Sequence, residues 1–266
     1  MEVLKKNIDI FKSLECGQIF RFKKLNNDSY LFFSKDEKCF VKEAQDKYVL
    51  QTTNDSYFYN FLNLNMDYIQ ILDSFRENKY INDYLPINPT IRIFKQDPFE
   101  TLISFIISAN NNIPRIKGII EKLSNALGEN KGDYFAFPMP NILAKQNEEF
   151  YKNIGLGYRA PYILDTSRKI ANNEFDLNKI YELKTSDARN YLMTLKGVGP
   201  KVADCILLFA YNRYDVFPVD TWVKKIYVNL FKKEDSINIM RENLISTFGE
   251  YSGIAQQYLF DNIRNK

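Results

Sequence analysis

Histidine is absent from this 266-residue chain, and cysteine is scarce. Without histidine the protein can have no Ser-His-Asp triad, no histidine-ligated metal and no imidazole acting as an acid or base. Any catalysis must therefore come from lysine, aspartate, glutamate, tyrosine or cysteine. The three cysteines, Cys16, Cys39 and Cys205, form no C-x-x-C pair. Such an odd, scattered set predicts a reducing compartment and argues against a disulfide framework or a zinc ribbon.

Long apolar segments are missing as well. No stretch approaches the roughly 20 apolar residues of a membrane span, and the N-terminus lacks the apolar core of a signal peptide. We therefore expect a cytoplasmic protein with no membrane partner. The net charge of +3 is small but uneven, because residues 1–90 carry 12 Lys and Arg against 13 Asp and Glu, and residues 91–266 carry 24 against 20. A nucleic acid would be expected to meet the second part first.

The order of the predicted elements indicates an α+β protein. Short aromatic or β-branched segments separated by polar turns predict an antiparallel meander over residues 19–25, 30–34, 38–43 and 48–52. Helical periodicity takes over from about residue 56 onward. We therefore expect an N-terminal antiparallel sheet domain with flanking helices over residues 1–90, and helical domains over residues 91–266.

Two helix starts are well marked in the second region. Asp97 is a predicted N-cap, Pro98 suits the first helical position, and Glu100 stands where a capping box requires it. The triplet Asn110-Asn111-Asn112 ends this helix, and another helix is predicted over residues 113–127. The triplet is therefore expected to form a tight polar turn between two helices.

The segment most informative about function is L-K-G-V-G-P-K-V-A-D-C, residues 195–205. Apolar helical faces before and after it predict a helix-hairpin-helix over about residues 186–212. Gly197 and Gly199 permit positive φ in a tight turn, and Val198 fills the gap between the helices. The missing side chains also let backbone N–H groups approach a phosphate at a helix N-terminus. The alternative is a plain corner between two helices, with no ligand.

Two charged residues near this hairpin are candidate catalytic groups. Lys201 lies in the first turn of the second helix, where the positive potential and partial burial disfavour an ammonium. A neutral lysine amine can attack an electrophilic carbon and form a Schiff base, although a lysine that contacts phosphate would fit the same local sequence. Asp220 is a predicted N-cap, and a carboxylate fixed in this way can also stabilise positive charge at a sugar C1′.

The segments L-K-G-V-G-P-K-V-A-D-C and P-V-D resemble the helix-hairpin-helix DNA glycosylases, and among them the eukaryotic-type 8-oxoguanine DNA glycosylase/AP lyases. Further matching segments extend over roughly residues 14–264, including residues 17–21, 104–106, 110–113, 155–160 and 255–260. The resemblance implies an N-terminal antiparallel sheet followed by an all-helical core. It also implies a monomer that excises 8-oxoguanine from double-stranded DNA without a metal or other cofactor, and that associates with the nucleoid when acting.

The resemblance implies roles for the two candidate catalytic residues. Lys201 would attack C1′ of the damaged nucleotide and carry the Schiff base through β-elimination. Asp220 would stabilise the oxocarbenium-like transition state. One departure concerns Trp222, because the family usually has a histidine at this position, and a phosphate contact is therefore lost or replaced. The chain also lacks the four-cysteine iron–sulfur loop of the endonuclease III branch.

A second set of implied roles concerns the damaged base, which must leave the stack to be read. The Gly17 carbonyl would accept the N7–H that 8-oxoguanine has and guanine lacks. Gln256 would read the Watson–Crick edge, while Cys205 and Phe260 would hold the flipped ring between them. From the residues alone, Gly17 could be only a turn, and Cys205 and Phe260 could be only core.

A third set would contact the DNA around the lesion. Asn110, Arg115 and Arg159 resemble residues that meet the orphaned cytosine, and Tyr158 resembles the wedge that holds the gap open. Alternatively, these are an ordinary polar loop and solvated arginines. The complete set of predicted DNA-contacting residues is Asn110, Asn111, Arg115, Tyr158, Arg159, Gly197, Val198 and Gly199.

Two other functions compete with 8-oxoguanine excision. A related glycosylase could remove another damaged base, although alkylpurine enzymes of the superfamily usually lack the lysine found at position 201. A non-catalytic DNA-binding helix-hairpin-helix protein would need neither the Lys201–Asp220 pair nor residues that bind a base. Trapping of a covalent complex with lesion DNA by borohydride would distinguish a catalytic protein from a non-catalytic one.

Overall fold

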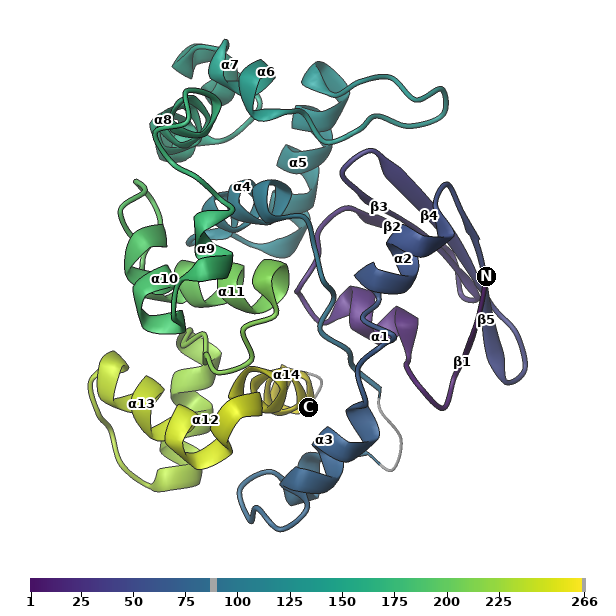
Figure 1. The fold of residues 1–266 in the computed structure, drawn as a ribbon, viewed down its shortest axis with the longest axis vertical. Helices are drawn as coiled ribbons and strands as arrows, with labels where there is room; N and C mark the ends of the chain where they lie inside the picture. The colour runs from purple at the N-terminus through teal and green to yellow at the C-terminus, as the bar shows by residue number, and fades with distance from the viewer. Residues whose placement is uncertain (87–89, 265–266) are drawn as a thin grey trace.

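An antiparallel sheet lies at one side of the molecule, and a larger group of helices fills the other side (Figure 1). The chain is described by a computed structural model over residues 1–86 and 90–264. Within these residues five strands follow the order β1-β5-β4-β3-β2 and have the bounds β1 Glu2–Leu4, β2 Phe22–Asn26, β3 Ser29–Ser34, β4 Glu37–Glu43 and β5 Lys47–Thr52. The predicted α+β fold with an N-terminal antiparallel sheet is confirmed. The domain boundary at residue 90 stays a prediction.

The predicted meander is confirmed for β2 to β5, with two differences near its start. Strands β2 to β5 each pair with the next strand along the chain. The sequence pattern does not predict β1, which pairs with β5 so that Val3 lies opposite Tyr48. Strand β2 begins at Phe22 rather than at residue 19, and residues 19–21 before it are all buried. Arg21 in this stretch pairs with Glu100, which lies outside the sheet.

The smaller of two hydrophobic cores lies between the sheet and two short helices. These helices have the bounds α1 Ile10–Glu15 and α2 Asp55–Phe61. Each begins at a side-chain cap, Asp9 for α1 and Asn54 for α2, which satisfies a backbone N–H of the first turn. In β5, Tyr48 and Leu50 are buried and Val49 is exposed, so one face of the strand supplies the core. Phe58 and Phe61 of α2 belong to the same core.

Helices account for most of the chain after β5, as the sequence predicts. Their bounds are α3 Tyr68–Phe75, α4 Pro98–Ser108, α5 Ile113–Leu127, α6 Pro140–Ala144, α7 Glu148–Asn153, α8 Ala160–Ala171, α9 Lys179–Glu182, α10 Thr185–Leu192, α11 Pro200–Tyr211, α12 Thr221–Phe231, α13 Ile237–Phe248 and α14 Ser252–Arg264. Short 3-10 turns lie at Asn82–Tyr84, Gly157–Arg159 and Gly249–Tyr251. Of the described helices, none has the length and apolar character needed to cross a membrane.

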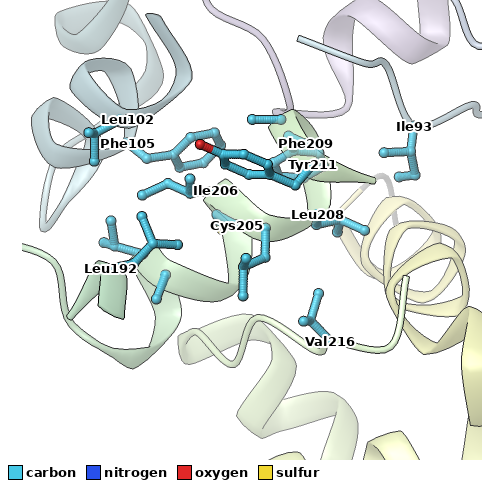
Figure 2. Close-up of a cluster of buried hydrophobic side chains, with 14 of the residues drawn as sticks. Ile93, Leu102, Phe105, Leu192, Cys205, Ile206, Leu208, Phe209, Tyr211 and Val216 are labelled. Carbon is cyan, nitrogen blue, oxygen red and sulfur yellow. The ribbon is translucent and has the colours of Figure 1, made fainter. Parts of the chain in front are cut away.

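Helices α4 and α11 form the centre of the larger core. Asp97 caps α4 as predicted, because its side chain accepts the Glu100 N–H at 2.9 Å and Pro98 takes the first helical position. Every residue of α4 from 99 to 107 is buried, so this helix is enclosed on all sides. Phe105 of α4 stacks on Phe209 of α11 with ring centroids 5.4 Å apart (Figure 2). Close packing of α4 against α11 therefore holds the side chains at the ends of these two helices in fixed positions.

A buried ion pair joins the sheet to these helices. The Glu100 carboxylate does not fold back as in a capping box but accepts the Lys35 N–H at 2.7 Å and pairs with Arg21 at 3.3 Å. Arg21 also donates to the Lys35 carbonyl at 3.1 Å and to the Phe135 carbonyl at 2.7 Å. Burial raises the pKa of the Glu100 carboxyl, and the Arg21 guanidinium opposes that rise. The chain entering β2 is thereby held against α4.

Candidate active site and DNA-contacting hairpin

The predicted helix-hairpin-helix consists of α10, α11 and the turn over residues 193–199. Gly197 has φ +83°, and a Cβ there would lie 2.6 Å from the Tyr162 ring, so this position requires glycine. Gly199 differs from the expectation, because its φ of −90° is open to any residue and a Cβ would meet nothing within 4 Å. Val198 is buried between the helices, as predicted. Exposed Gly199 leaves the N-terminus of α11 open to an anion.

Asp204 forms buried ion pairs that stabilise this hairpin, and the sequence pattern does not predict this role. Its side chain is 1 % exposed and accepts from Arg189 of α10 at 2.9 Å and from Arg241 of α13 at 2.7 Å. Burial raises the pKa of the Asp204 carboxyl, and the two guanidinium groups oppose the rise. Because a buried carboxylate is stable only when it is paired, this cluster fixes α10 against α11.

A cavity of about 410 Å³ opens beside the N-terminus of α11. Its walls come from the turn after α1, the end of α4, the start of α5, α11, the segment before α12, and α14. The catalytic and base-binding residues predicted from the sequence all line it: Gly17, Lys201, Cys205, Asp220, Gln256 and Phe260. The fold thus brings together residues that lie up to 243 positions apart in the chain.

Lys201 enters the cavity from the second position of α11. Its Nζ atom lies 5.4 Å from the centroid of the Phe105 ring, and the side chain is half-buried. One turn later, burial raises the pKa of the Cys205 thiol to about 11, and the neighbouring Lys201 ammonium opposes that rise. The amine therefore lies beside apolar and thiol groups, with no carboxylate ion-paired to it among the described residues.

Asp220 caps α12 as predicted and lies in the wall of the same cavity. Its Oδ1 atom accepts both the Trp222 N–H at 2.9 Å and the Val223 N–H at 2.8 Å. Both cap bonds use one carboxylate oxygen, so the second oxygen takes no part in the cap. A carboxylate held in this way can stabilise positive charge that develops within the cavity.

Trp222 lines the same cavity as Lys201 and Asp220. Its side chain is 42 % exposed, and the Lys225 Nζ atom lies 4.6 Å from the ring centroid. An indole cannot carry the charge that a histidine can offer to a phosphate, but it presents a broad aromatic face. This position therefore offers a stacking surface with a cation beside it.

Gly17 occupies a tight turn after α1 and has φ +91°. The next residue, Gln18, is fully buried, and its Nε2 atom donates to the Ser13 and Arg92 carbonyls, each at 2.8 Å. The Gln18 Oε1 atom in turn accepts the Phe94 N–H at 2.8 Å. These bonds anchor the residue that follows Gly17, a role for Gln18 that the sequence pattern does not predict.

Helix α14 brings two adjacent glutamines to the cavity, of which the sequence analysis identified one. Gln256 is 5 % exposed and Gln257 is 4 % exposed. The Gln257 Nε2 atom donates to the Gln256 Oε1 atom at 2.8 Å. Phe260, one turn further on, is half-buried at the cavity edge. One face of α14 therefore supplies both polar and aromatic groups.

The residues predicted to meet the opposite strand gather where α4 ends and α5 begins. Arg159 is 3 % exposed and donates to the Ala109 carbonyl at 2.9 Å and to the Asn110 carbonyl at 2.8 Å. Tyr158 is exposed, and its hydroxyl donates to the Ala109 carbonyl at 3.2 Å. Arg115 donates to the Gly155 carbonyl at 3.1 Å. Their contacts with DNA stay predictions.

Asn111 differs from its neighbours in this turn because it lines the cavity itself. Its Nδ2 atom donates to the Ile107 carbonyl at 3.1 Å, which satisfies a carbonyl near the end of α4. Asn110 is exposed and has φ +50°, a conformation that asparagine tolerates better than most residues. The asparagine turn therefore faces both the cavity and the outer surface.

Comparison with known proteins places the chain in a family. Residues 1–102 match the N-terminal domain of 8-oxoguanine DNA glycosylase, and residues 103–246 match the HhH-GPD superfamily of base excision DNA repair proteins. The chain is 33 % identical to a probable N-glycosylase/DNA lyase of Methanothermobacter thermautotrophicus, over 72 % of this chain and 69 % of that protein. It is 28 % identical to an N-glycosylase/DNA lyase of Saccharomyces cerevisiae, over 98 % of this chain and 84 % of that protein.

A solved structure agrees with these matches. The fold is similar to that of the Clostridium acetobutylicum 8-oxoguanine glycosylase/lyase bound to double-stranded DNA with cytosine opposite 8-oxoguanine. The TM-score is 0.92 and the identity 35 %, over 100 % of this chain and 98 % of that chain. The chain therefore belongs to the HhH-GPD superfamily of base excision DNA repair proteins, in the branch that carries the N-terminal domain of 8-oxoguanine DNA glycosylases.

Proposed function

We propose that this protein removes 8-oxoguanine from duplex DNA and then cleaves the strand at the resulting site. The observation that carries this proposal is that Lys201, Asp220 and the Gly17 turn share one cavity. A volume of about 410 Å³ lies within the range of about 300–1,000 Å³ that is typical of small-molecule sites. A base extruded from the duplex with its sugar suits a cavity of this size, and extrusion is necessary because the stack hides C1′.

The chemistry begins with the Lys201 amine. Its lone pair attacks C1′ while the bond from C1′ to the base breaks, and the base leaves with the bonding electrons and takes up a proton. Opening of the sugar ring gives a Schiff base between Nζ and C1′. Loss of a proton from C2′ then expels the 3′ phosphate and cleaves the strand. Asp220 opposes the positive charge that builds on the sugar as the base leaves.

Selection of the lesion requires an acceptor directed at N7. In 8-oxoguanine N7 carries a proton, whereas in guanine it carries a lone pair. The Gly17 carbonyl is our candidate, because Gly17 lines the cavity and the buried side chain of Gln18 anchors the residue that follows it. Two lone pairs facing each other in a desolvated site cost on the order of 1–3 kcal/mol, so guanine would be disfavoured by roughly ten- to hundredfold.

A direct experiment tests the activity. The protein is incubated with a duplex that contains a single 8-oxoguanine, placed opposite each of the four bases in turn, and borohydride is added to trap a Schiff base. We expect base release, strand cleavage and a covalent protein–DNA adduct. A duplex with guanine in place of the lesion serves as the control. Tight binding of the lesion duplex without release or adduct would instead support a non-catalytic DNA-binding protein.

Replacing Gly17 by alanine should abolish 8-oxoguanine excision while binding of abasic-site DNA survives. The φ of +91° is costly for a residue with a Cβ, so the turn must twist and its carbonyl must move. Abasic DNA brings no base to the cavity and does not depend on that carbonyl. Excision rates and binding to an abasic duplex, measured side by side, check this expectation.

Gly132→Ala is the matched control for this variant. Gly132 has a similar φ of +96°, a Cβ there would meet nothing within 4 Å, and the residue does not line the cavity. It should carry a comparable backbone strain and leave excision intact. Full excision by Gly17→Ala would show that the turn lies away from the base, and N7 recognition would then belong to another group.

A further inference from the structure

We propose that Gln257 reads the damaged base together with Gln256, its Oε1 atom accepting a hydrogen bond from the exocyclic amino group of the lesion. The inference rests on the proposed excision of 8-oxoguanine and adds a further specificity-determining residue to it. Gln257 lines the same cavity as Lys201 and Asp220. Neither the resemblance nor the sequence pattern assigns it a role.

The first observation is an acceptor without a partner. The Gln257 Oε1 atom is buried, and no hydrogen bond to it is found within the described residues. Buried polar atoms in native proteins are nearly always satisfied, and an exception in a binding cavity indicates a group that awaits a ligand. Other buried polar side chains of α14 are satisfied by the protein, since Ser252 contacts the Val216 carbonyl and Tyr258 donates to the Ile91 carbonyl.

The second observation is the bond between the two glutamines. The Gln257 Nε2 atom donates to the Gln256 Oε1 atom at 2.8 Å. This bond occupies the Gln256 carbonyl and leaves its amide N–H groups for the base. The pair therefore presents a donor from Gln256 and an acceptor from Gln257, and each amide fixes the orientation of the other.

This pattern matches one edge of the lesion. The Watson–Crick edge of 8-oxoguanine has the O6 acceptor at one end and the N2 amino donor at the other. Gln256 Nε2 would donate to O6, and Gln257 Oε1 would accept from the N2 amino group. The edge of 8-oxoadenine has an amino donor where 8-oxoguanine has O6, so it would place a donor against the Gln256 amide and be rejected.

The test removes each partner of the proposed bond in turn. Single-turnover excision is measured on duplexes with 8-oxoguanine or with 8-oxohypoxanthine, which lacks only the N2 amino group. We expect the unaltered protein to prefer 8-oxoguanine by roughly ten- to hundredfold, because the hypoxanthine lesion leaves the Gln257 oxygen unpaired. In Gln257→Leu the preference should fall to about twofold or less, through slower excision of 8-oxoguanine.

A second variant separates recognition of the amino group by Gln257 from its hydrogen bond to Gln256. Gln257→Glu keeps an acceptor but cannot donate to Gln256, so excision of both lesions should slow while the preference for the amino group persists. Cleavage of an abasic duplex, which brings no base, reports folding and should change far less than excision in either variant. A Gln257→Leu protein that keeps the full preference would overturn the inference. Failure of the unaltered protein to excise 8-oxoguanine would instead contradict the proposed function.

Discussion

Lys201→Gln is expected to abolish both base release and the borohydride-trapped adduct, while the lesion duplex is still bound. Glutamine has no nucleophilic amine, so neither the attack on C1′ nor the Schiff base can form. The other residues of the cavity wall and the hairpin backbone are unchanged by the substitution, and we expect them to supply the binding. Base release, trapping and an electrophoretic shift on the same duplex measure the three properties together.

Lys196→Gln is the matched control for the loss of the nucleophile. Lys196 lies in the same hairpin but is 64 % exposed and pairs with Asp165 at 3.2 Å. Its replacement removes one exposed charge from the hairpin and leaves the cavity lining unchanged, so trapping should persist. An adduct that still forms with Lys201→Gln would mean that another amine is the nucleophile, and Lys201 would then be a phosphate contact.

Asp220→Asn is expected to slow base excision by about a hundredfold or more, the scale seen when a positioned electrostatic group is removed. Asparagine caps helices as well as aspartate does, so the bonds to Trp222 N–H and Val223 N–H can persist. Loss of the charge at the helix N-terminus should cost no more than about 1 kcal/mol of stability. Single-turnover kinetics and urea unfolding measure the two effects separately.

Asp67→Asn is the matched control, because Asp67 caps a helix in the same way as Asp220 but lies outside the cavity. Asp67 caps α3 through one oxygen that accepts the Ile69 and Gln70 N–H groups, each at 3.1 Å, and it does not line the cavity. A similar small change in unfolding free energy, with unchanged excision, is expected for this variant. Near-normal excision by a folded Asp220→Asn protein would reduce Asp220 to a cap alone.

Local signals in the sequence were sufficient for much of the fold. The caps at Asp97 and Asp220 depend on bonds within three residues, so the sequence pattern specifies them directly. The turn of the hairpin is also specified locally through the positive φ of Gly197, although the ring that excludes a Cβ there belongs to Tyr162, 35 positions earlier. The resemblance then placed six distant residues in one site, and the structure places those six in one cavity.

Features that depend on distant partners could not be predicted in this way. Strand β1 has three residues and takes its register from β5, more than forty positions later. Gln18 acquires its anchoring role only when Arg92 and Phe94 arrive beside it. Glu100 fits a capping box in the sequence. Its carboxylate instead forms an ion pair with Arg21, which precedes β2 and lies 79 positions earlier in the chain. Long-range pairing overrides local preference at such positions.

Trp222 gives the protein a built-in optical reporter. It is the one tryptophan in the sequence, and it lines the cavity. The indole emission of the protein therefore arises from a single position beside the reacting groups, and stacking of a nucleobase on that ring would quench it. In the Lys201→Gln protein the same signal would follow arrival of the lesion alone. The time course of base extrusion could thus be separated from that of bond cleavage, with no label on either molecule.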